Sequence, residues 1–364
     1  MNGNKRKKKH VLRNVFLSVI LLIILGGAAY GMSRYRGVKD SVNSSFKPSG
    51  VTKERDVSDA LKNKKPISIL LMGTDTGALG RDYKGRTDSM MVITLNPKNQ
   101  KTTVTSIPRD TAVNIPGYKS VSPAKINAAY SYGQTKTAIN TVQKLLNVPI
   151  DFYALINMGG MEKVINKVGG VDVTPTLSFT YEGYSFKKGE KTHMNGKKAL
   201  AYSRMRYDDP KGDYGRQTRQ REVLTSLVHK STSISTLLNQ SFINSLSDQT
   251  QTDLTFDELT ALAKDYNSVR KHTSETHLQG ESKEVAKQSM EVMKKSELQR
   301  VTDFIRENLD LSKAKTGTIA YDPATESSKT NQTAEDINNI GSQSNSSSSN
   351  GTGSGNSGYS NSGY

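Results

Sequence analysis

An uncharged apolar run near the start of the chain constrains its fold more than any other feature. Residues 15–32, VFLSVILLIILGGAAYGM, contain no acidic or basic side chain. Eighteen helical residues at about 1.5 Å each extend about 27 Å, close to the roughly 30 Å hydrocarbon core of a bilayer. We therefore expect a single transmembrane helix, which places everything after it on one side of a membrane.

The charges ahead of this run indicate its orientation. Residues 1–14 carry six cations and no acid: Lys5, Arg6, Lys7, Lys8, Lys9 and Arg13. By the positive-inside rule, residues 1–14 form a cytoplasmic tail and the chain beyond residue 32 is extracytoplasmic. The alternative is a cleaved signal peptide, because Gly27 and Ala29 could precede a cleavage site. Both hypotheses place the bulk of the chain outside the cytoplasm, the first as a single-pass protein of the cytoplasmic membrane.

The composition limits the chemistry that is available. The chain has no cysteine, which excludes disulfides, a thiol nucleophile and cysteine-bound metals. The formal net charge is +17, and +11 remains when the six cytoplasmic cations are set aside. Outside a cell, a basic surface favours phospholipid headgroups or anionic wall polymers over nucleic acid. Many of these lysines could also serve solubility alone.

Hydrophobic periodicity predicts a mixed α/β fold. Residues 67–72, 89–96, 102–107 and 151–156 have the length and composition of strands, and residues 97–100 have the character of a hairpin connection. Residues 138–146 and 158–168 have helical spacing, and Gly169 and Gly170 end the second helix. We expect a mixed central sheet that is covered by helices.

Changes in polarity and composition divide the chain into segments. Residues 33–65 are polar and predict a juxtamembrane spacer, and residues 66–230 form the main domain. Residues 231–320 predict a C-terminal extension, packed on that domain or held loosely beside it, with a capping box at Thr255 and Glu258. Residues 321–364 end in Ser, Gly and Asn and predict a disordered tail.

Two aspartates flank the first two predicted strands. Asp75 follows the strand that ends at Met72, and Asp88 precedes the strand that begins at Ser89. Neighbouring strands would bring both carboxylates to one edge of the sheet, where they could hold Mg²⁺ together with substrate phosphates. The structural alternative is that Asp75 caps a turn and Asp88 pairs with Arg86.

Arginines gather at two further places. Arg109, in SIPRD, emerges at the end of a strand, where open α/β sheets commonly bind ligands, although it could simply pair with Asp110. In YSRMRYDDPKGDYGRQTRQR, residues 202–221, Arg204 and Arg206 point the same way if the chain is extended.

Residues 215–230 predict a helix whose apolar stripe continues, toward its N-terminus, into cations. The stripe consists of Val223, Leu224, Leu227 and Val228, and it extends back through Arg216, Arg219 and Gln220. Arg221 and Gln217 are expected to point elsewhere. Inward arginines at a helix N-terminus suit a ligand with more than one phosphate.

Six short motifs, in this order, resemble the LytR-CpsA-Psr (LCP) family. They are GTD at residues 73–75, GRTDSM at 85–90, SIPRD at 106–110, KINAAY at 125–130, GGVDV at 169–173 and AYSRMRYDDPKGDYGRQTRQREV at 201–223. The basic tail and single apolar run are also similar to that family, and the resemblance covers about residues 66–230.

The resemblance implies a transferase that moves an anionic glycopolymer, a teichoic acid or capsular polysaccharide, from a polyprenyl-pyrophosphate carrier to peptidoglycan. It implies that Asp75 and Asp88 bind Mg²⁺, with Mn²⁺ as the alternative, and that these two acids act in catalysis with Arg109, Arg204 and Arg206. The side chains it implies around the pyrophosphate, to which Arg219 is added from the helix pattern, are Arg86, Arg109, Lys125, Arg204, Arg206, Arg216, Arg219 and Gln220.

The resemblance further implies an apolar cavity for the lipid tail, and we expect the helices over residues 138–146 and 158–168 to form its walls. Asp75 is the candidate general base for the acceptor hydroxyl. No cysteine and no Gly-x-Ser-x-Gly elbow supplies a nucleophile, so direct transfer is the simplest hypothesis. His193 and His229 fit no triad and are expected at the surface.

Three other functions stay open at this point. A transcriptional regulator is disfavoured, because about fourteen cytoplasmic residues are too few for a DNA-binding fold. A non-catalytic module for anionic polymers or lipid phosphates would need the arginines but not the paired aspartates. A polyprenyl-pyrophosphate hydrolase would use the same residues with water as the acceptor.

Overall fold

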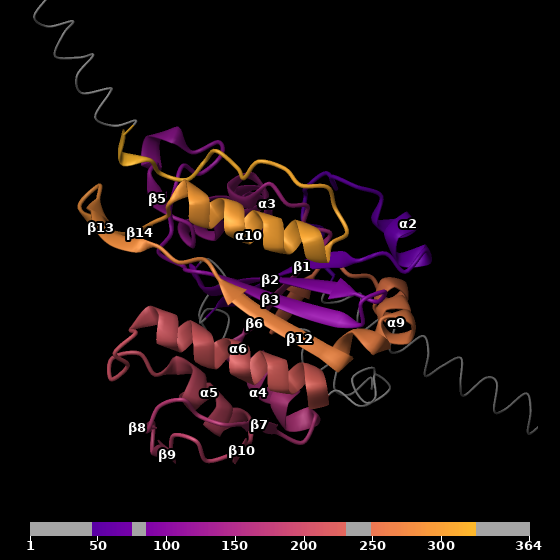
Figure 1. Ribbon diagram of the computed structural model, residues 1–364, viewed down its shortest axis with the longest axis vertical. Coiled ribbons are helices and arrows are strands. Elements are labelled where there is room, and N and C mark those ends of the chain that lie inside the picture. Colours follow the sequence, from indigo (N-terminus) through magenta and orange to yellow (C-terminus); the bar gives the residue numbers. More distant parts are fainter. Residues whose placement is uncertain (1–45, 75–84, 231–248, 325–364) are drawn as a thin grey trace, which may run out of the picture. The chain divides into compact units, whose positions relative to one another are not determined.

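The computed structural model describes residues 46–74, 85–230 and 249–324 (Figure 1). The predicted cytoplasmic tail and transmembrane helix, residues 1–32, lie outside this range, as do Asp75 and most of the predicted tail. None of the helices within the described range has both the length and the apolar character needed to cross a bilayer.

A mixed six-stranded sheet forms the centre of the fold, as the sequence predicts. Its strand order is β11-β6-β1-β2-β3-β12. Strand β1 (Ile67–Thr74) pairs antiparallel with β2 (Thr87–Asn96) and parallel with β6 (Phe152–Asn157). Strand β3 (Lys101–Ile107) follows β2 through the predicted hairpin, and β12 (His272–His277) runs parallel to it. The short β11 (Thr250–Thr252) pairs antiparallel with β6.

The two faces of the sheet are covered by different helices. On one side lie α3 (Ala128–Leu146) and α10 (Lys295–Asn308), and on the other lie α4 (Met158–Lys167), α5 (Gly196–Arg204) and α6 (Asp213–Lys230) (Figure 1). Successive residues of β1 alternate between these faces. Leu70 and Met72 enter the core under α3 and α10, whereas Leu71 and Gly73 face α4–α6.

Four short strands extend the layer of α4–α6. Strand β7 (Val171–Val173) pairs with β10 (Thr192–Met194), and β8 (Phe179–Tyr181) pairs with β9 (Tyr184–Phe186). Phe186 and Tyr202 meet at a ring separation of 5.1 Å in a second core cluster, which Val223 of α6 joins.

The remaining elements complete the rim of the fold. They are α2 (Val57–Lys62), β4 (Ala112–Val113), β5 (Ala124–Lys125), α9 (Phe256–Asp265), the hairpin of β13 (Glu281–Val285) and β14 (Gln288–Val292), and 3-10 helices over Lys119–Val121 and Asn267–Lys271. The predicted capping box at Thr255 and Glu258 is present at the start of α9.

The predicted boundary between a main domain and an extension at residue 231 is wrong. Strands β11 and β12 belong to the same central sheet as β1–β3, and α10 buries Val301 and Ile305 in the main core. The described residues as far as Tyr321 form one unit, and a second unit begins at Asp322. Periodicity alone did not reveal this, because a strand's partners are distant in sequence.

Residues 46–65 are also part of this unit rather than a spacer. Val57 and Leu61 of α2 are buried against Phe152. Arg55 donates from Nε to Asp151 Oδ1 at 2.7 Å, and the backbone N–H of Ser68 donates to Oδ2 at 2.7 Å. Asp151 is almost fully buried, so this pairing fixes the segment to the ends of β1 and β6.

Substitution Arg55→Ala should destabilise the fold by about 3–5 kcal/mol, because it leaves the buried Asp151 carboxylate without its cation. Urea unfolding of the purified protein measures this free energy. The control is Lys65→Ala, which removes an exposed ion pair with Asp59 and should cost at most about 1 kcal/mol. Equal effects of the two substitutions would show that residues 46–65 are not integral to the fold.

Glu222 of α6 gives the packing of α5 and α6 a pH dependence. Burial raises the pKa of its carboxyl above the ordinary 4.5, although Tyr202 donates a hydrogen bond to Oε2 at 2.6 Å. Because the folded pKa is the higher one, the folded state holds this proton more tightly. The contribution of Glu222 to stability therefore falls as the pH rises from 4.5 through the folded pKa.

Substitution Glu222→Gln should therefore stabilise the protein relative to the wild type, and by more at pH 7 than at pH 4.5. The reason is that glutamine stays neutral and still accepts the hydrogen bond from Tyr202. The measurement is the urea midpoint between pH 4.5 and pH 8 for the variant and the wild type. Glu307→Gln, at an exposed position, should leave that profile unchanged. An unaltered profile in the Glu222 variant would contradict the assignment.

Candidate functional site

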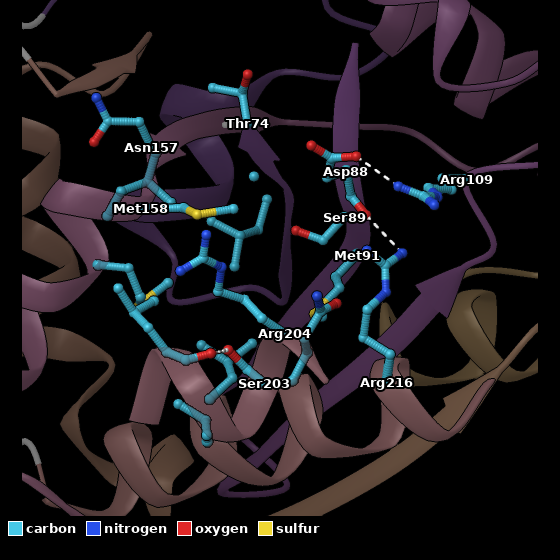
Figure 2. A pocket seen from close by; sticks show the side chains of 18 of the residues that line it. Thr74, Asp88, Ser89, Met91, Arg109, Asn157, Met158, Ser203, Arg204 and Arg216 are labelled. Atoms are coloured by element: carbon cyan, nitrogen blue, oxygen red, sulfur yellow. Dashed lines mark hydrogen bonds and ion pairs between the residues drawn. The ribbon is translucent and has the colours of Figure 1, made fainter. Parts of the chain in front are cut away.

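A cavity of about 490 Å³ lies between the central sheet and the layer of α4–α6 (Figure 2). Its floor is the end of β1 and the beginning of β2, where Gly73 pairs with Ser89. A Cβ on Gly73 would lie 2.3 Å from Ser89 Oγ, so a larger residue at this position would force the Ser89 hydroxyl to rotate away. The polar and charged lining residues are Thr74, Asp88, Ser89, Arg109, Asn157, Ser203, Arg204, Arg206, Arg216 and Gln220.

Asp88 and Arg109 form the rim of this cavity on the side of the sheet. Arg109 Nη1 donates to Asp88 Oδ1 at 2.7 Å, and Arg216 Nη2 donates to the Asp88 carbonyl at 3.2 Å (Figure 2). The structural alternative, in which Asp88 pairs with Arg86, is not found, because the partner of Asp88 is Arg109. Arg86 is exposed and does not line the cavity, so it does not lie where the predicted pyrophosphate contact requires. Asp88 is already the second residue of β2.

Asp213, in the first turn of α6, is the acid around which three arginines gather. Its Oδ1 lies 2.7 Å from Arg216 Nη2, 3.9 Å from Arg109 Nε and 3.9 Å from Arg206 Nε. A carboxylate at a helix N-terminus is also stabilised by the helix dipole. The sequence interpretation missed Asp213, although its spacing of three from Arg216 is the signal of an ion pair on one helix face.

The burial of Arg216 prepares it to bind an anion. Arg216 is 8% exposed. Burial lowers the pKa of its guanidinium, and the negative charge of Asp213 opposes that shift. Its Nε is buried without a hydrogen-bond partner among the described residues, as is Nε of Arg109. A buried donor without an acceptor is costly, so a ligand oxygen that accepts these bonds would gain affinity.

Arg204 and Arg206 both line the cavity, but not because the chain is extended. Arg204 is the last residue of α5, and Arg206 lies in the turn that follows. Arg204 Nη1 lies 3.1 Å from Glu182 Oε1, between β8 and β9. The prediction of an extended segment is thus wrong, whereas both guanidinium groups lie in the cavity as expected.

Arg219 has a structural position instead of the predicted pyrophosphate contact. Its Nε donates to the Tyr202 carbonyl at 3.0 Å, and its other donors reach Asp209 and the Met205 carbonyl. These bonds fasten the turn that carries Arg206 to α6. Gly215 makes this possible, because a Cβ there would lie 1.9 Å from Asp209 Oδ2.

The prediction that Arg221 and Gln217 point away from the protein interior is also wrong. Both are buried, and Arg221 Nη1 donates to Ser106 Oγ of β3 at 3.0 Å. Helix α6 is enclosed by the sheet on one side and by α5 on the other, so it has little solvent-exposed face near its start. Lys125 lies beside Asp110, 2.7 Å from Oδ1, and is not part of the cavity lining.

Beyond the arginines the cavity is apolar. This part, which we call the apolar arm, is lined by Leu71, Met91, Ile156, Met158, Met161, Leu200, Val223 and Leu224. Helix α4 therefore forms a wall, as predicted. The expectation for residues 138–146 is wrong, because α3 lies on the opposite face of the sheet, where Ile139 and Val142 enter the main core.

Among the described residues, no three His, Cys, Asp or Glu side chains stand close enough together to hold a metal ion. Asp88 alone offers a carboxylate at the cavity rim, and Asp75 lies outside the described residues. One or two carboxylates suffice for Mg²⁺ when substrate phosphates complete the coordination. The donor set thus fits a metal that binds with its substrate. His193 and His229 are exposed, as predicted.

Comparisons with known proteins point to one family. The LytR_cpsA_psr family matches residues 32–307. A relative from Enterococcus faecalis, named polyisoprenyl-teichoic acid–peptidoglycan teichoic acid transferase TagU, is 38% identical over 305 residues, which cover 84% of this chain and 99% of the relative.

Solved structures agree with this match. Protein gbs0355 from Streptococcus agalactiae is 34% identical, with a TM-score of 0.66, over 76% of this chain and 98% of that one. A structure described as TagT bound to LIIa-WTA is 27% identical, with a TM-score of 0.59, over 72% of this chain and 95% of that one.

Substitution Arg216→Met should weaken the binding of inorganic pyrophosphate about 10- to 100-fold, because one charge-assisted hydrogen bond contributes about 1.5–3 kcal/mol. Isothermal titration calorimetry in Mg²⁺ buffer measures this. Arg300→Met is the matched control, since Arg300 is half-exposed and pairs with Glu297 away from the cavity. Unchanged affinity in the Arg216 variant, or equal loss in both, would exclude Arg216 from the anion site.

Proposed function

Because the chain belongs to the LytR_cpsA_psr family, we propose that it transfers a teichoic acid, or a related anionic glycopolymer such as a capsular polysaccharide, from a polyisoprenyl-pyrophosphate carrier to peptidoglycan. The name of the Enterococcus faecalis relative describes transfer of teichoic acid from a polyisoprenyl-linked form to peptidoglycan, and that relative is covered almost completely.

The observation that carries the proposal is the two-part character of one cavity. Arg109, Arg206 and Arg216 gather around Asp213, Arg204 also lines the cavity, and the rest of the lining consists mainly of aliphatic and methionine side chains. A ligand that fills both parts is an amphiphile with a multiply charged anionic head. A lipid-linked diphosphate has this form, and its tail would gain about 0.8 kcal/mol for each methylene buried.

The chain's own residues account for most of the reaction. The acceptor hydroxyl oxygen forms a bond to the phosphorus that bears the polymer. The phosphoanhydride bond breaks, its electron pair leaves with the polyisoprenyl phosphate, and the hydroxyl proton passes to a base. The arginines stabilise the charge that grows on the leaving phosphate. Asp213 pairs with Arg216 at 2.7 Å and lies 3.9 Å from Arg109 and from Arg206, so its charge helps to hold these cations close together.

Two features of the site extend beyond the described residues. Asp88 would hold Mg²⁺ together with Asp75, and the metal would neutralise phosphate charge. Asp75 is also the proposed base. We further propose that residues 15–32 anchor the chain in the cytoplasmic membrane, with the transferase domain on its outer side, next to a membrane-embedded donor.

The test is a transfer assay with a polyisoprenyl-pyrophosphate-linked saccharide, Mg²⁺ and peptidoglycan oligomers, followed by mass spectrometry. The wild type should join saccharide phosphate to glycan. Asp88→Asn and Arg109→Ala should each lower the rate about 10²- to 10³-fold, because each removes charge stabilisation at the reacting phosphates. Chelation of the metal should stop the reaction.

Asp59→Asn, at an exposed acid on α2, is the matched control and should transfer at the wild-type rate. Release of saccharide phosphate without joining, even with glycan present, would instead identify a hydrolase. Tight donor binding with no product, unaffected by Asp88→Asn, would identify a binding module.

A further inference from the structure

A second group of cations lies in the segment KKGEKTHMNGKK, residues 187–198. It contains five lysines, Lys187, Lys188, Lys191, Lys197 and Lys198, which we call the distal lysine cluster, and a single acid, Glu190. All except the partly buried Lys198 are exposed. In the described part of the chain, the ion pair recorded for the cluster is Lys187 with Glu190, at 3.7 Å and well exposed. Within the described ranges, none of these lysines lines the cavity that holds the arginines.

The cluster lies at the end of the helical layer that is remote from the arginines. Three of its lysines occupy the connection between β9 and β10, and two lie in the first turn of α5. The backbone N–H of Gly196, where α5 begins, donates to Asn166 Oδ1, near the end of α4, at 2.8 Å. Helices α4 and α5 therefore run in opposite directions: α4 begins and α5 ends at the cavity, with Met158 and Arg204. Eight helical steps along α5, about 12 Å, separate Arg204 from Gly196.

The apolar arm of the cavity extends toward this same end. Along α6 the lining passes from Arg216 to Leu224, eight residues or about 12 Å away from the arginines. Further along α6, Ser226 Oγ accepts a hydrogen bond from the Asp172 N–H at 2.9 Å, and Asp172 pairs with His193 of β10. Along α5 the lining runs back to Leu200, one turn from Lys197. In Figure 1, β8–β10 lie beyond α4–α6 as seen from the central sheet.

We propose that the distal lysine cluster docks the domain on the anionic headgroups of the membrane from which it takes its lipid-linked substrate. This rests on the proposed function, because it assumes that a lipid tail occupies the apolar arm. Clustered lysines attract an anionic lipid surface, and the attraction extends over about a Debye length. With the cluster at the headgroups, the tail end of the cavity faces the bilayer and the arginines stand away from it.

An anionic membrane fits the cluster better than an anionic polymer. The polymer is attached to the diphosphate, so it would emerge at the arginines, at the opposite end of α5 from these lysines. The tail end of the same substrate comes from the bilayer. If residues 15–32 form the anchor, the link from Met32 to Phe46 spans at most about 50 Å, which keeps the cluster within reach of the membrane.

The experiment uses the full-length protein in vesicles and measures the depth of a fluorescent label. The chain has no cysteine, so Ser185→Cys gives a unique labelling position on β9, two residues before the cluster. Ser282→Cys on β13 is the matched control, since both serines are exposed on two-stranded hairpins and lie within hydrogen-bonding distance of a cross-strand hydroxyl. Lipids with spin-labelled headgroups quench the label in phosphatidylcholine vesicles with or without phosphatidylglycerol.

The label at residue 185 should be quenched at least about threefold more with phosphatidylglycerol than without it, whereas the label at residue 282 should not respond. Replacing Lys187, Lys188, Lys191 and Lys197 by glutamine, or adding about 1 M salt, should abolish the difference. Equal quenching in both vesicles, or quenching that survives these substitutions, would overturn the proposal.

A label at residue 185 that responds to soluble poly(glycerol phosphate), and not to vesicles, would likewise overturn it and assign the cluster to a polymer. The quenching measurement requires neither the lipid-linked saccharide nor peptidoglycan, so it gives a result whether or not glycopolymer transfer occurs. Transfer without lipid-dependent quenching would refute only the docking surface. Quenching without transfer would refute only the proposed function.

Discussion

The burial of charged side chains on α6 is the constraint on which the rest of the structure depends. Arg216, Gln217, Arg219 and Arg221 all lie in the interior, in the first half of a helix that is enclosed on two sides. A buried guanidinium without partners would cost several kcal/mol, which is a large part of the net stability of a domain. Each of these arginines therefore requires acceptors, and the surrounding elements are placed where they supply them.

Those acceptors come from segments that are far apart in the sequence. Arg221 reaches Ser106 on β3 and lies 3.4 Å from Glu275 on β12, so both of these strands are tied to α6. Tyr214 donates to Glu291 Oε2 on β14 at 2.7 Å and accepts from the Gly280 N–H at 2.8 Å. The residues after 250 thus fix the N-terminal turn of α6, which gives that region a positioning role.

The cavity lies where one face of β1 and β2 meets one face of α6, and each face is set by the periodicity of its own secondary structure. In β1 and β2, alternate residues turn away from the main core and present Leu71, Gly73 and Met91 to the helices. In α6, a repeat of three to four residues presents Arg216, Gln220 and then Leu224. The lining therefore changes from cationic to aliphatic along one face of α6, and the sheet changes with it, from Asp88 and Ser89 to Leu71 and Met91.

The sequence by itself determined the strands β1, β2, β3 and β6, the helix α4, and the gathering of Arg109, Arg204, Arg206 and Arg216 around one cavity. Such features are local: periodicity of two or of about 3.6, glycines at helix ends, and charges next to strand ends. Only the tertiary structure decided which arginines line the cavity and which hold the fold. Arg219 and Arg216 are three residues apart and chemically identical, yet Asp209 and two carbonyls occupy Arg219, whereas Arg216 keeps a buried donor unpaired. That distinction depends on partners brought together by chain folding, as does the inclusion of β11 and β12 in the central sheet, and neither is encoded within any short window of residues.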